Sequence, residues 1–447
     1  MKKIIKDNKW YVIIVAIFLL FTIGYKIYKW NNTDYIDKEV VNLVLPTSEM
    51  TNTLRELVDK FNLESKDIHI NYTNYELDYI NIAITKLVNQ REIDIFEYFD
   101  RFLVDKDQIA NLDSLDIDYS KIDNGATVKL NNDVVGIKYG SSIPKMIINK
   151  DILKKAGIEN FNGINTFEEL IDIANKIKEN VPGVTPIGIS TSSVGDNFMM
   201  VGTPSAMNSN IYSTFWNYSE GKYTFNEATE TLEMYRNLYN NGLINKDFDT
   251  KISTNVLKDF TDGKVAITFN QYYNKKILVE NSKDMNISIE DIPVFNSENL
   301  NKRYYYPYNK ILVIRNYDKD IDLLSDVEKE KVEDHKKAVK KVYEWLMSEE
   351  VTGQLIKNDS SFVSFDKNIY NDVELSEFNE DTNFEHEILD PSIFISVNKY
   401  LIRNTFSELI KGSDDIESRL KELEESINRE VKEDMENSKV NLDMYKE

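Results

Sequence analysis

The stretch Val40-Val-Asn-Leu-Val-Leu45 begins an alternation of strands and helices that decides the fold class of this chain. Apolar residues at helical spacing follow at 50–61, and a second strand pattern covers 68–72. A second helical pattern at 77–88 leads to a third strand pattern at 93–96. Each helix carries the chain back to the same edge of a sheet, so such an alternation is typical of parallel pairing. The sequence therefore predicts an α/β fold with a largely parallel sheet.

The alternation continues through the rest of the chain. The predicted strands cover 145–148, 265–269 and 311–314, and the predicted helices cover 151–156, 166–177, 228–239 and 338–347. Thr166-Phe-Glu-Glu169 is a capping box, which marks the start of one of these helices. An apolar stripe at 416–435 predicts a last helix, with a coiled-coil partner as the alternative to packing on the body. The stripe is short for a coiled coil, so we expect it to pack on the body.

The composition excludes several classes of function. The 447 residues contain no cysteine, which excludes disulfides, thiolate metal sites and cysteine nucleophiles. The formal net charge of -22 argues against nucleic acid as a partner, because phosphate contacts need a basic face. The three histidines lie far apart in sequence and form no motif for a metal ion or a catalytic triad. We expect no metal, no cofactor and no catalytic residue.

The N-terminus carries a predicted membrane anchor. The uncharged apolar run at 10–25 follows four lysines, and two more lysines follow it. No small-residue cleavage site comes after the run, and no cysteine is available for lipid attachment, so we favour an uncleaved anchor over a signal peptide. The prediction is a cytoplasmic segment at 1–9, a single-pass transmembrane helix at 10–30 and a linker at 31–39. The positive charge before the run places the body outside the cell.

Five sequence blocks occur in one order along the chain. They are Val135-Gly-Ile-Lys-Tyr139 with Ile148-Asn-Lys-Asp-Ile-Leu-Lys-Lys-Ala-Gly157, Asn165-Thr-Phe-Glu-Glu-Leu170, Gly221-Lys-Tyr-Thr-Phe-Asn226, Asp259-Phe-Thr-Asp-Gly-Lys-Val-Ala-Ile267 and Val342-Tyr-Glu-Trp-Leu-Met-Ser-Glu-Glu350. Together they resemble the family 1 extracellular solute-binding proteins of ABC importers, the carbohydrate group that includes maltose-binding protein. No block is specific alone, but chance matches would not keep their order. The resemblance departs at Tyr139-Gly140, where the family often has proline.

The resemblance implies a type II periplasmic-binding-protein-like fold with two α/β lobes. It places 40–142 with 270–312 in the N-terminal lobe, and 143–269 with 313–447 in the C-terminal lobe. Ligand binds in the cleft between the lobes and closes them by a hinge motion. The resemblance therefore implies a binding protein and not an enzyme, and we expect a monomer.

The resemblance also points to ligand contacts after two strands. The family carries an aromatic residue that stacks on ligand after the strand at 265–269, where Tyr273 is the best match, Tyr272 the second, and Asn270 lies beside them. The alternative for both tyrosines is an ordinary loop position. After the strand at 93–96, Asp100-Arg101-Phe102 is similar to a family triplet whose Asp and Arg contact sugar, and Tyr98 precedes it. A surface Asp–Arg pair is an equal alternative.

Further aromatic residues complete the predicted ligand site. Tyr139 lies before the first crossover, and the others lie in segments that border the cleft in the family: Phe198, Trp216, Tyr305 and Tyr306. Phe198 and Trp216 suit the core equally well. The first crossover, around Ile143-Pro-Lys145, lacks the glutamate that contacts maltodextrin in the family, so a maltodextrin ligand is not supported.

Three functions are compatible with these patterns. The first is a membrane-tethered solute-binding protein that delivers a sugar or oligosaccharide to an ABC permease with a cytoplasmic ATPase. The second is a receptor of the same fold that presents ligand to a sensor kinase. The third is a tethered glycoside hydrolase that uses two carboxylates. The ordered blocks favour the first, since no motif singles out a pair of acids.

Overall fold

The computed structural model describes most of the chain after residue 37. The described residues are 38–48, 50–97, 101–120, 122, 126–142, 144–207, 209–271, 275–300, 308–319, 321–358 and 390–446. The predicted transmembrane helix and most of the predicted linker lie outside them. Within this part of the chain, no helix has the length and apolar character needed to cross a membrane.

Six strands form the larger of two main sheets, in the order β2-β1-β3-β12-β5-β4. They are β1 (Glu39–Pro46), β2 (Ile68–Tyr75), β3 (Ile95–Glu97), β4 (Thr127–Leu130), β5 (Asp133–Ser142) and β12 (Tyr308–Ile314). The first three strands pair in parallel, as the sequence predicts. β12 runs antiparallel to both β3 and β5, and β4 and β5 form an antiparallel pair. The sheet is therefore mixed, with its parallel part at the N-terminus.

Helices cover both faces of this sheet. The helices of this unit are α3 (Thr51–Glu64), α4 (Leu77–Gln90), α5 (Arg101–Asp105), α13 (Asp326–Leu346) and α14 (Glu349–Asn358). Alternate β1 residues point to opposite faces. Leu43 lies in the core shared with α3 and α13, while Val44 lies in the core shared with α4. Burial of both faces explains why the β1 strand is almost continuously apolar.

The smaller sheet has four strands in the order β11-β6-β10-β7. They are β6 (Pro144–Asn149), β7 (Thr185–Gly188), β10 (Val265–Gln271) and β11 (Ile287–Glu290). Its flanking helices are α6 (Lys150–Lys155), α7 (Phe167–Asn180), α11 (Ser253–Thr261) and α12 (Lys275–Asn281). The predicted capping box is confirmed. The Thr166 side chain accepts a hydrogen bond from the Glu169 backbone N–H, and the Glu169 side chain accepts one from the Thr166 backbone N–H.

A helical layer packs beside the smaller sheet. It contains α8 (Val194–Asn197), a π-helix (Phe198–Gly202), α9 (Thr203–Ala206), the hairpin of β8 (Trp216–Asn217) and β9 (Lys222–Tyr223), α10 (Thr229–Asn240), α15 (Lys399–Lys411) and α16 (Ile416–Met435). Short 3-10 turns lie at Asp113–Leu115, Asn226–Ala228, Ser297–Asn299, Ile321–Leu323, Pro391–Ile393 and Leu442–Tyr445. The apolar stripe of α16 is buried against the other elements of this layer, through residues such as Leu420 and Ile427. The predicted packing of the last helix on the body is confirmed.

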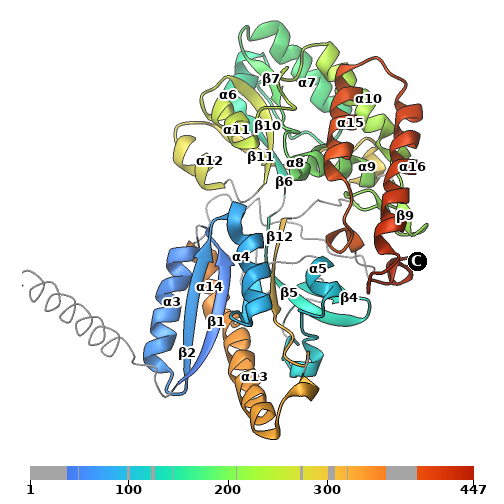
Figure 1. Cartoon of the computed structure of the whole chain (residues 1–447). Coiled ribbons are helices and arrows are strands. Elements are labelled where there is room, and N and C mark those ends of the chain that lie inside the picture. Colours follow the sequence, from blue (N-terminus) through green and yellow to red (C-terminus); the bar gives the residue numbers. More distant parts are fainter. Residues whose placement is uncertain are drawn as a thin grey trace, which may run out of the picture.

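The two sheets define two units, drawn one above the other in Figure 1. The predicted α/β architecture of helix-flanked sheets is confirmed. The chain passes between the units from β5 to β6, from β11 to β12, and after α14. The predicted lobe boundaries differ from this division. α12 and β11, within 270–312, pack with the smaller sheet, while α13 and α14, within 313–447, pack with the larger one.

Candidate functional site

Three polar residues meet at the carboxyl end of β3, beside the strands that pass between the units. Glu97 is the last residue of β3 and is 9% exposed. The Tyr139 hydroxyl on β5 donates a hydrogen bond to the Glu97 carboxylate. Burial raises the pKa of Glu97 above its ordinary value, although the charge of Lys310 on β12 and the hydrogen bond from Tyr139 oppose the shift. A desolvated acid thus lies where β5 and β12 approach the second unit.

The second unit brings further buried polar groups to the same boundary. Lys145 lies near the start of β6 and is 3% exposed, and its ammonium pairs with Asp291 at 2.5 Å. Asn270 on β10 is opposite Lys145 in the antiparallel register and is 2% exposed. The predicted residue Asn270 therefore lies near the end of its strand, next to the passage from β5 to β6.

Charges of the two units also influence each other across the boundary. Lys138 on β5 and Lys399 at the start of α15 both lie in the field of Asp390. Burial raises the pKa of Asp390, although hydrogen bonds from Ser392 and Thr214 oppose it. Burial also lowers the pKa of Lys138 to about 8, with the charge of Asp390 acting against the shift. At this boundary, desolvation outweighs pairing for both signs of charge.

Arg101 is held by the last helix. Its Nη1 donates to the backbone oxygen of Asp434 at 3.0 Å and also bonds to the Asp434 carboxylate. Its Nε lies 3.4 Å from Asp105. The structure therefore shows Arg101 in an ion-pair network with α16. Contact between Arg101 and ligand stays a prediction.

Two of the predicted aromatic residues occupy the core. Trp216 is fully buried, and its Nε1 donates to the backbone oxygen of Tyr445 at 3.0 Å. Phe198 is 2% exposed, and its ring centroid lies 6.2 Å from that of Phe215. Both positions fit the core alternative that the sequence left open.

The remaining predicted residues lie outside the described part of the chain. They are Tyr98, Asp100, Tyr272, Tyr273, Tyr305 and Tyr306. Tyr139 and Asn270 are therefore the predicted residues that the structure brings to the boundary between the units. Their contact with ligand stays a prediction.

The boundary also contains charged residues that were not predicted as site residues. Glu97 directly follows the buried run Ile93-Asp-Ile-Phe96, Lys310 directly precedes Ile311-Leu-Val-Ile314, and Lys145 opens the strand at 145–148. A charged side chain at the end of an apolar strand is the signal that could have found all three. Such residues follow or precede a buried strand, so the chain holds them near the edge of the sheet.

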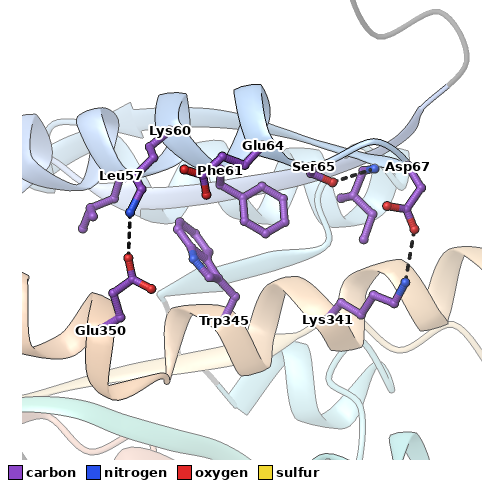
Figure 2. A pocket seen from close by; sticks show the side chains of 10 residues that line it. Leu57, Lys60, Phe61, Glu64, Ser65, Asp67, Lys341, Trp345 and Glu350 are labelled. Carbon is purple, nitrogen blue, oxygen red and sulfur yellow. Dashed lines mark hydrogen bonds and ion pairs between the residues drawn. The ribbon is translucent and has the colours of Figure 1, made fainter.

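A groove of about 390 Å³ lies elsewhere, between α3 and the helices α13 and α14. Figure 2 shows ion pairs across it from Lys60 to Glu350 at 2.9 Å and from Lys341 to Asp67 at 3.2 Å. All four of these side chains are more than half exposed. The ring of Trp345 on α13 packs against that of Phe61 on α3, with centroids 4.7 Å apart. We interpret the groove as a seam between packed helices.

The described residues show no arrangement of three or more acidic or histidine side chains that could hold a metal ion. The buried groups at the boundary are instead carboxylates, ammonium groups, an amide and a phenol. These are hydrogen-bonding groups suited to polar, non-metallic ligands.

Comparisons with known proteins agree with this architecture. The family model described as bacterial extracellular solute-binding protein matches residues 47–353. No curated protein sequence matches the chain. Among solved structures, the GacH receptor of Streptomyces glaucescens, studied without ligand and with acarbose, matches 88% of this chain and 99% of its own at 14% identity and a TM-score of 0.66.

Two further solved structures give the same result. The sugar-binding protein MalE of Xanthomonas citri covers 88% of this chain and 98% of its own, at 15% identity and a TM-score of 0.66. The cyclic alpha-maltosyl-1,6-maltose binding protein of Arthrobacter globiformis covers 89% and 100%, at 13% identity and a TM-score of 0.64. These likenesses establish the type II periplasmic-binding-protein fold.

Proposed function

Because the chain belongs to the bacterial extracellular solute-binding proteins, we propose that it captures a sugar or oligosaccharide and delivers it to an ABC importer. The ligand binds between the two units, which close on it by rotation about the passages that join them. The delivery partner is a permease served by a cytoplasmic ATPase. The chain binds its ligand and does not convert it.

The observation that carries this proposal is the set of buried polar groups where the units meet. A sugar hydroxyl both donates and accepts hydrogen bonds, so its recognition needs acceptors and donors that are fixed in place. Glu97, Tyr139 and Asn270 offer a carboxylate, a phenol and an amide, and each is less than a tenth exposed. Groups held in a desolvated setting bind a polar ligand more selectively than groups on a wet surface.

The local charge balance supports an uncharged ligand. Glu97 lies in the field of Lys310, and Lys145 pairs with Asp291 at 2.5 Å. Because these charges compensate each other, the ligand does not need to carry a charge of its own. A ligand rich in hydroxyl groups suits such a site better than an ion does.

Closure explains how ligand binding is signalled to a partner. Residues that contact the ligand come from both units, so the ligand favours the closed arrangement over the open one. The partner then recognises the closed form. Lys138 belongs to the first unit and Asp390 to the second, and the charge of Asp390 acts on Lys138 across the boundary.

The proposal is tested by thermal unfolding and calorimetry of the full chain in detergent with a panel of glycans. A ligand at one hundred times its Kd stabilises the folded state by about 2.7 kcal/mol. Tyr139→Phe is expected to weaken this stabilisation. Tyr235→Phe is the control, because Tyr235 is also a buried tyrosine but lies on α10, and this change should leave the stabilisation unaltered. Stabilisation by a peptide or an ion, with none by any glycan, refutes the sugar ligand.

The predicted anchor supplies the tether in this proposal. The apolar run at 10–25 and its flanking lysines hold the body at the outer face of the cell membrane as a single-pass protein. Alkaline carbonate extraction tests the tether. The full chain is expected to stay with the membranes, and release of the intact chain by carbonate contradicts it.

A further inference from the structure

The end of the chain contacts both units. α16 packs on the second unit, and its Asn428 exchanges hydrogen bonds with the backbone of Tyr223 at 3.0 and 2.8 Å. Figure 1 shows α16 running from this unit toward β4 and α5 of the first unit, where the chain ends. We call residues 434–446 the strap.

The strap contacts the first unit at the end of α5. Arg101 Nη1 donates to the Asp434 backbone oxygen at 3.0 Å. The Asp105 carboxylate accepts from Ser438 Oγ at 2.9 Å and from the Lys439 backbone N–H at 3.0 Å. The Lys439 ammonium also pairs with Asp107. Both charge signs on the strap thus meet a partner of opposite sign in the first unit.

A second set of contacts lies at the turn between β4 and β5. Asn131 stands there in the left-handed region, with a φ of 55°. Its side-chain oxygen accepts from the Asn441 backbone N–H at 2.9 Å. The Tyr445 hydroxyl accepts from the Asn131 backbone N–H at 3.0 Å and donates to the Lys129 backbone oxygen at 3.2 Å. The strap therefore satisfies backbone groups that the turn itself leaves over.

Tyr445 joins the two units within one residue. Its hydroxyl bonds to the β4–β5 turn, while its backbone oxygen accepts from Trp216 Nε1 of the second unit at 3.0 Å. Its ring packs near Phe394 of the second unit, with centroids 6.0 Å apart. Tyr445 is 1% exposed, so these bonds are shielded from water.

We propose that the strap is a non-covalent brace between the two units that limits how far they open. The covalent passages alone leave the units free to rotate about them, and the strap adds a fourth connection at β4 and α5. Opening beyond the reach of the strap must break its hydrogen bonds and ion pairs. A narrower ensemble loses less conformational entropy when ligand closes it. The strap thus raises ligand affinity without contacting ligand.

The consequence for affinity rests on the proposed function, but the brace itself does not. Because the chain has no cysteine, one cysteine in each unit gives a unique pair of spin labels. Lys86→Cys on α4 and Lys176→Cys on α7 are both at exposed positions. Double electron–electron resonance on the ligand-free full chain then reports the distance distribution between the units. A failure to bind any sugar leaves this measurement intact.

The strap is weakened by Tyr445→Phe, which removes both hydroxyl bonds and keeps the ring, combined with Lys439→Ala at a half-exposed position. We expect a broader distribution with a longer mean distance, and ligand affinity reduced on the order of fivefold. Tyr400→Phe, at a 67% exposed position on α15, is the matched control and should reproduce the parent distribution.

Two outcomes overturn the brace. One is an unchanged distance distribution in the folded double variant. The other is an equal change in the Tyr400→Phe control. If the double variant fails to fold, Asp105→Ala alone decides the matter, because it removes the partly buried acceptor for Ser438 Oγ and for the Lys439 backbone N–H and leaves Tyr445 in place. A distribution for Asp105→Ala that matches the parent then overturns the brace.

Discussion

Asp94 directly precedes the short strand β3 and Glu97 is its last residue. Both are buried carboxylates, yet their environments shift the pKa in opposite directions. Asp94 is 2% exposed and accepts hydrogen bonds from Tyr317 at 2.6 Å and from the Asn42 backbone at 2.7 Å. His335 lies 3.1 Å from it. Although burial alone raises the pKa of Asp94, these partners hold it below its ordinary value. The pKa of Glu97 is raised.

The difference separates a structural ion network from a boundary site. Around Asp94, pairing outweighs desolvation and the charged forms are stabilised. Around Glu97, Lys138 and Asp390, desolvation outweighs pairing and favours the neutral form of each group. The pKa values of Glu97 and Asp390 are therefore raised, and that of Lys138 is lowered. Perturbed groups of the second kind cluster at functional sites. Burial alone therefore does not distinguish the two carboxylates; the balance between burial and partners does.

The largest expected effect comes from breaking the Asp94 network. Asp94→Ala removes the carboxylate that pairs with Arg315 and one of the two that His335 contacts, the other being Glu39. It also removes an acceptor for the Asn42 backbone. Loss of one partner from a buried ion network costs about 3–5 kcal/mol of unfolding free energy. Denaturant unfolding of the parent and variant measures it. A loss below about 1 kcal/mol contradicts the assignment of Asp94 as a structural group.

A change at Glu97 should act on ligand binding instead. Glu97→Gln keeps the shape of the side chain and removes a charge that burial already disfavours. We expect little change in unfolding free energy, and a Kd for the glycan that rises about tenfold, which corresponds to about 1.4 kcal/mol. Calorimetry with the glycan identified in the panel measures the Kd. An unchanged Kd in the folded variant removes Glu97 from the site.

The comparison also shows how far the sequence can predict this molecule. Periodicity located β1, β2, β3, β6, β10 and β12, the capping box at Thr166 and the packing of α16, because each depends on local patterns. It did not locate β4, β5, β7 or β11. The lobe bounds came from the resemblance instead, and they place β11 and α13 with the other unit than the structure does. Which strand pairs with which is decided by contacts between distant segments, and the alternation of elements is the same in either arrangement.

The boundary site was predictable only in part. Tyr139 and Asn270 came from the resemblance, and both lie at the boundary. Trp216 came from the same source and lies in the core, because residue type does not reveal which face of the unit an aromatic ring occupies. Glu97 was available as an acid ending an apolar strand. What the sequence could not supply was its contact with Tyr139 and Lys310, which lie far along the chain.

A smaller effect should appear in the pH dependence of stability. Burial would lower the pKa of His335, but its hydrogen bonds to Asp94 and Glu39 and their charges outweigh burial and raise it. A raised histidine pKa stabilises the folded state below the unfolded value of about 6.5, and this stabilisation is lost as the pH rises through the folded value. The free energy of unfolding should therefore decrease as the pH rises above 6.5.

His335→Gln is the matched variant for this test, since it keeps a hydrogen-bond donor and removes the titration. Its stability should be lower than that of the parent below pH 6.5, and its slope above that pH should be flatter. His69→Gln serves as the control, because burial lowers the pKa of His69. Parallel curves for the parent and His335→Gln would show that the Asp94 network does not depend on the charge of His335.

The smallest expected effect lies in the groove between α3 and α13, where charges pair on a wet surface. Lys60→Ala breaks the ion pair with Glu350. The side chains of Lys60 and Glu350 are 53% and 60% exposed. Water screens such a pair and solvates the partner left behind, so we expect no resolvable change in the unfolding midpoint. Glycan binding should also be unchanged, since the groove lies away from the boundary between the units. An effect comparable to that of Asp94→Ala would mean that pairing alone, without burial, determines which charges matter. The contrast between the two ends of β3 would then have to be explained by something other than desolvation.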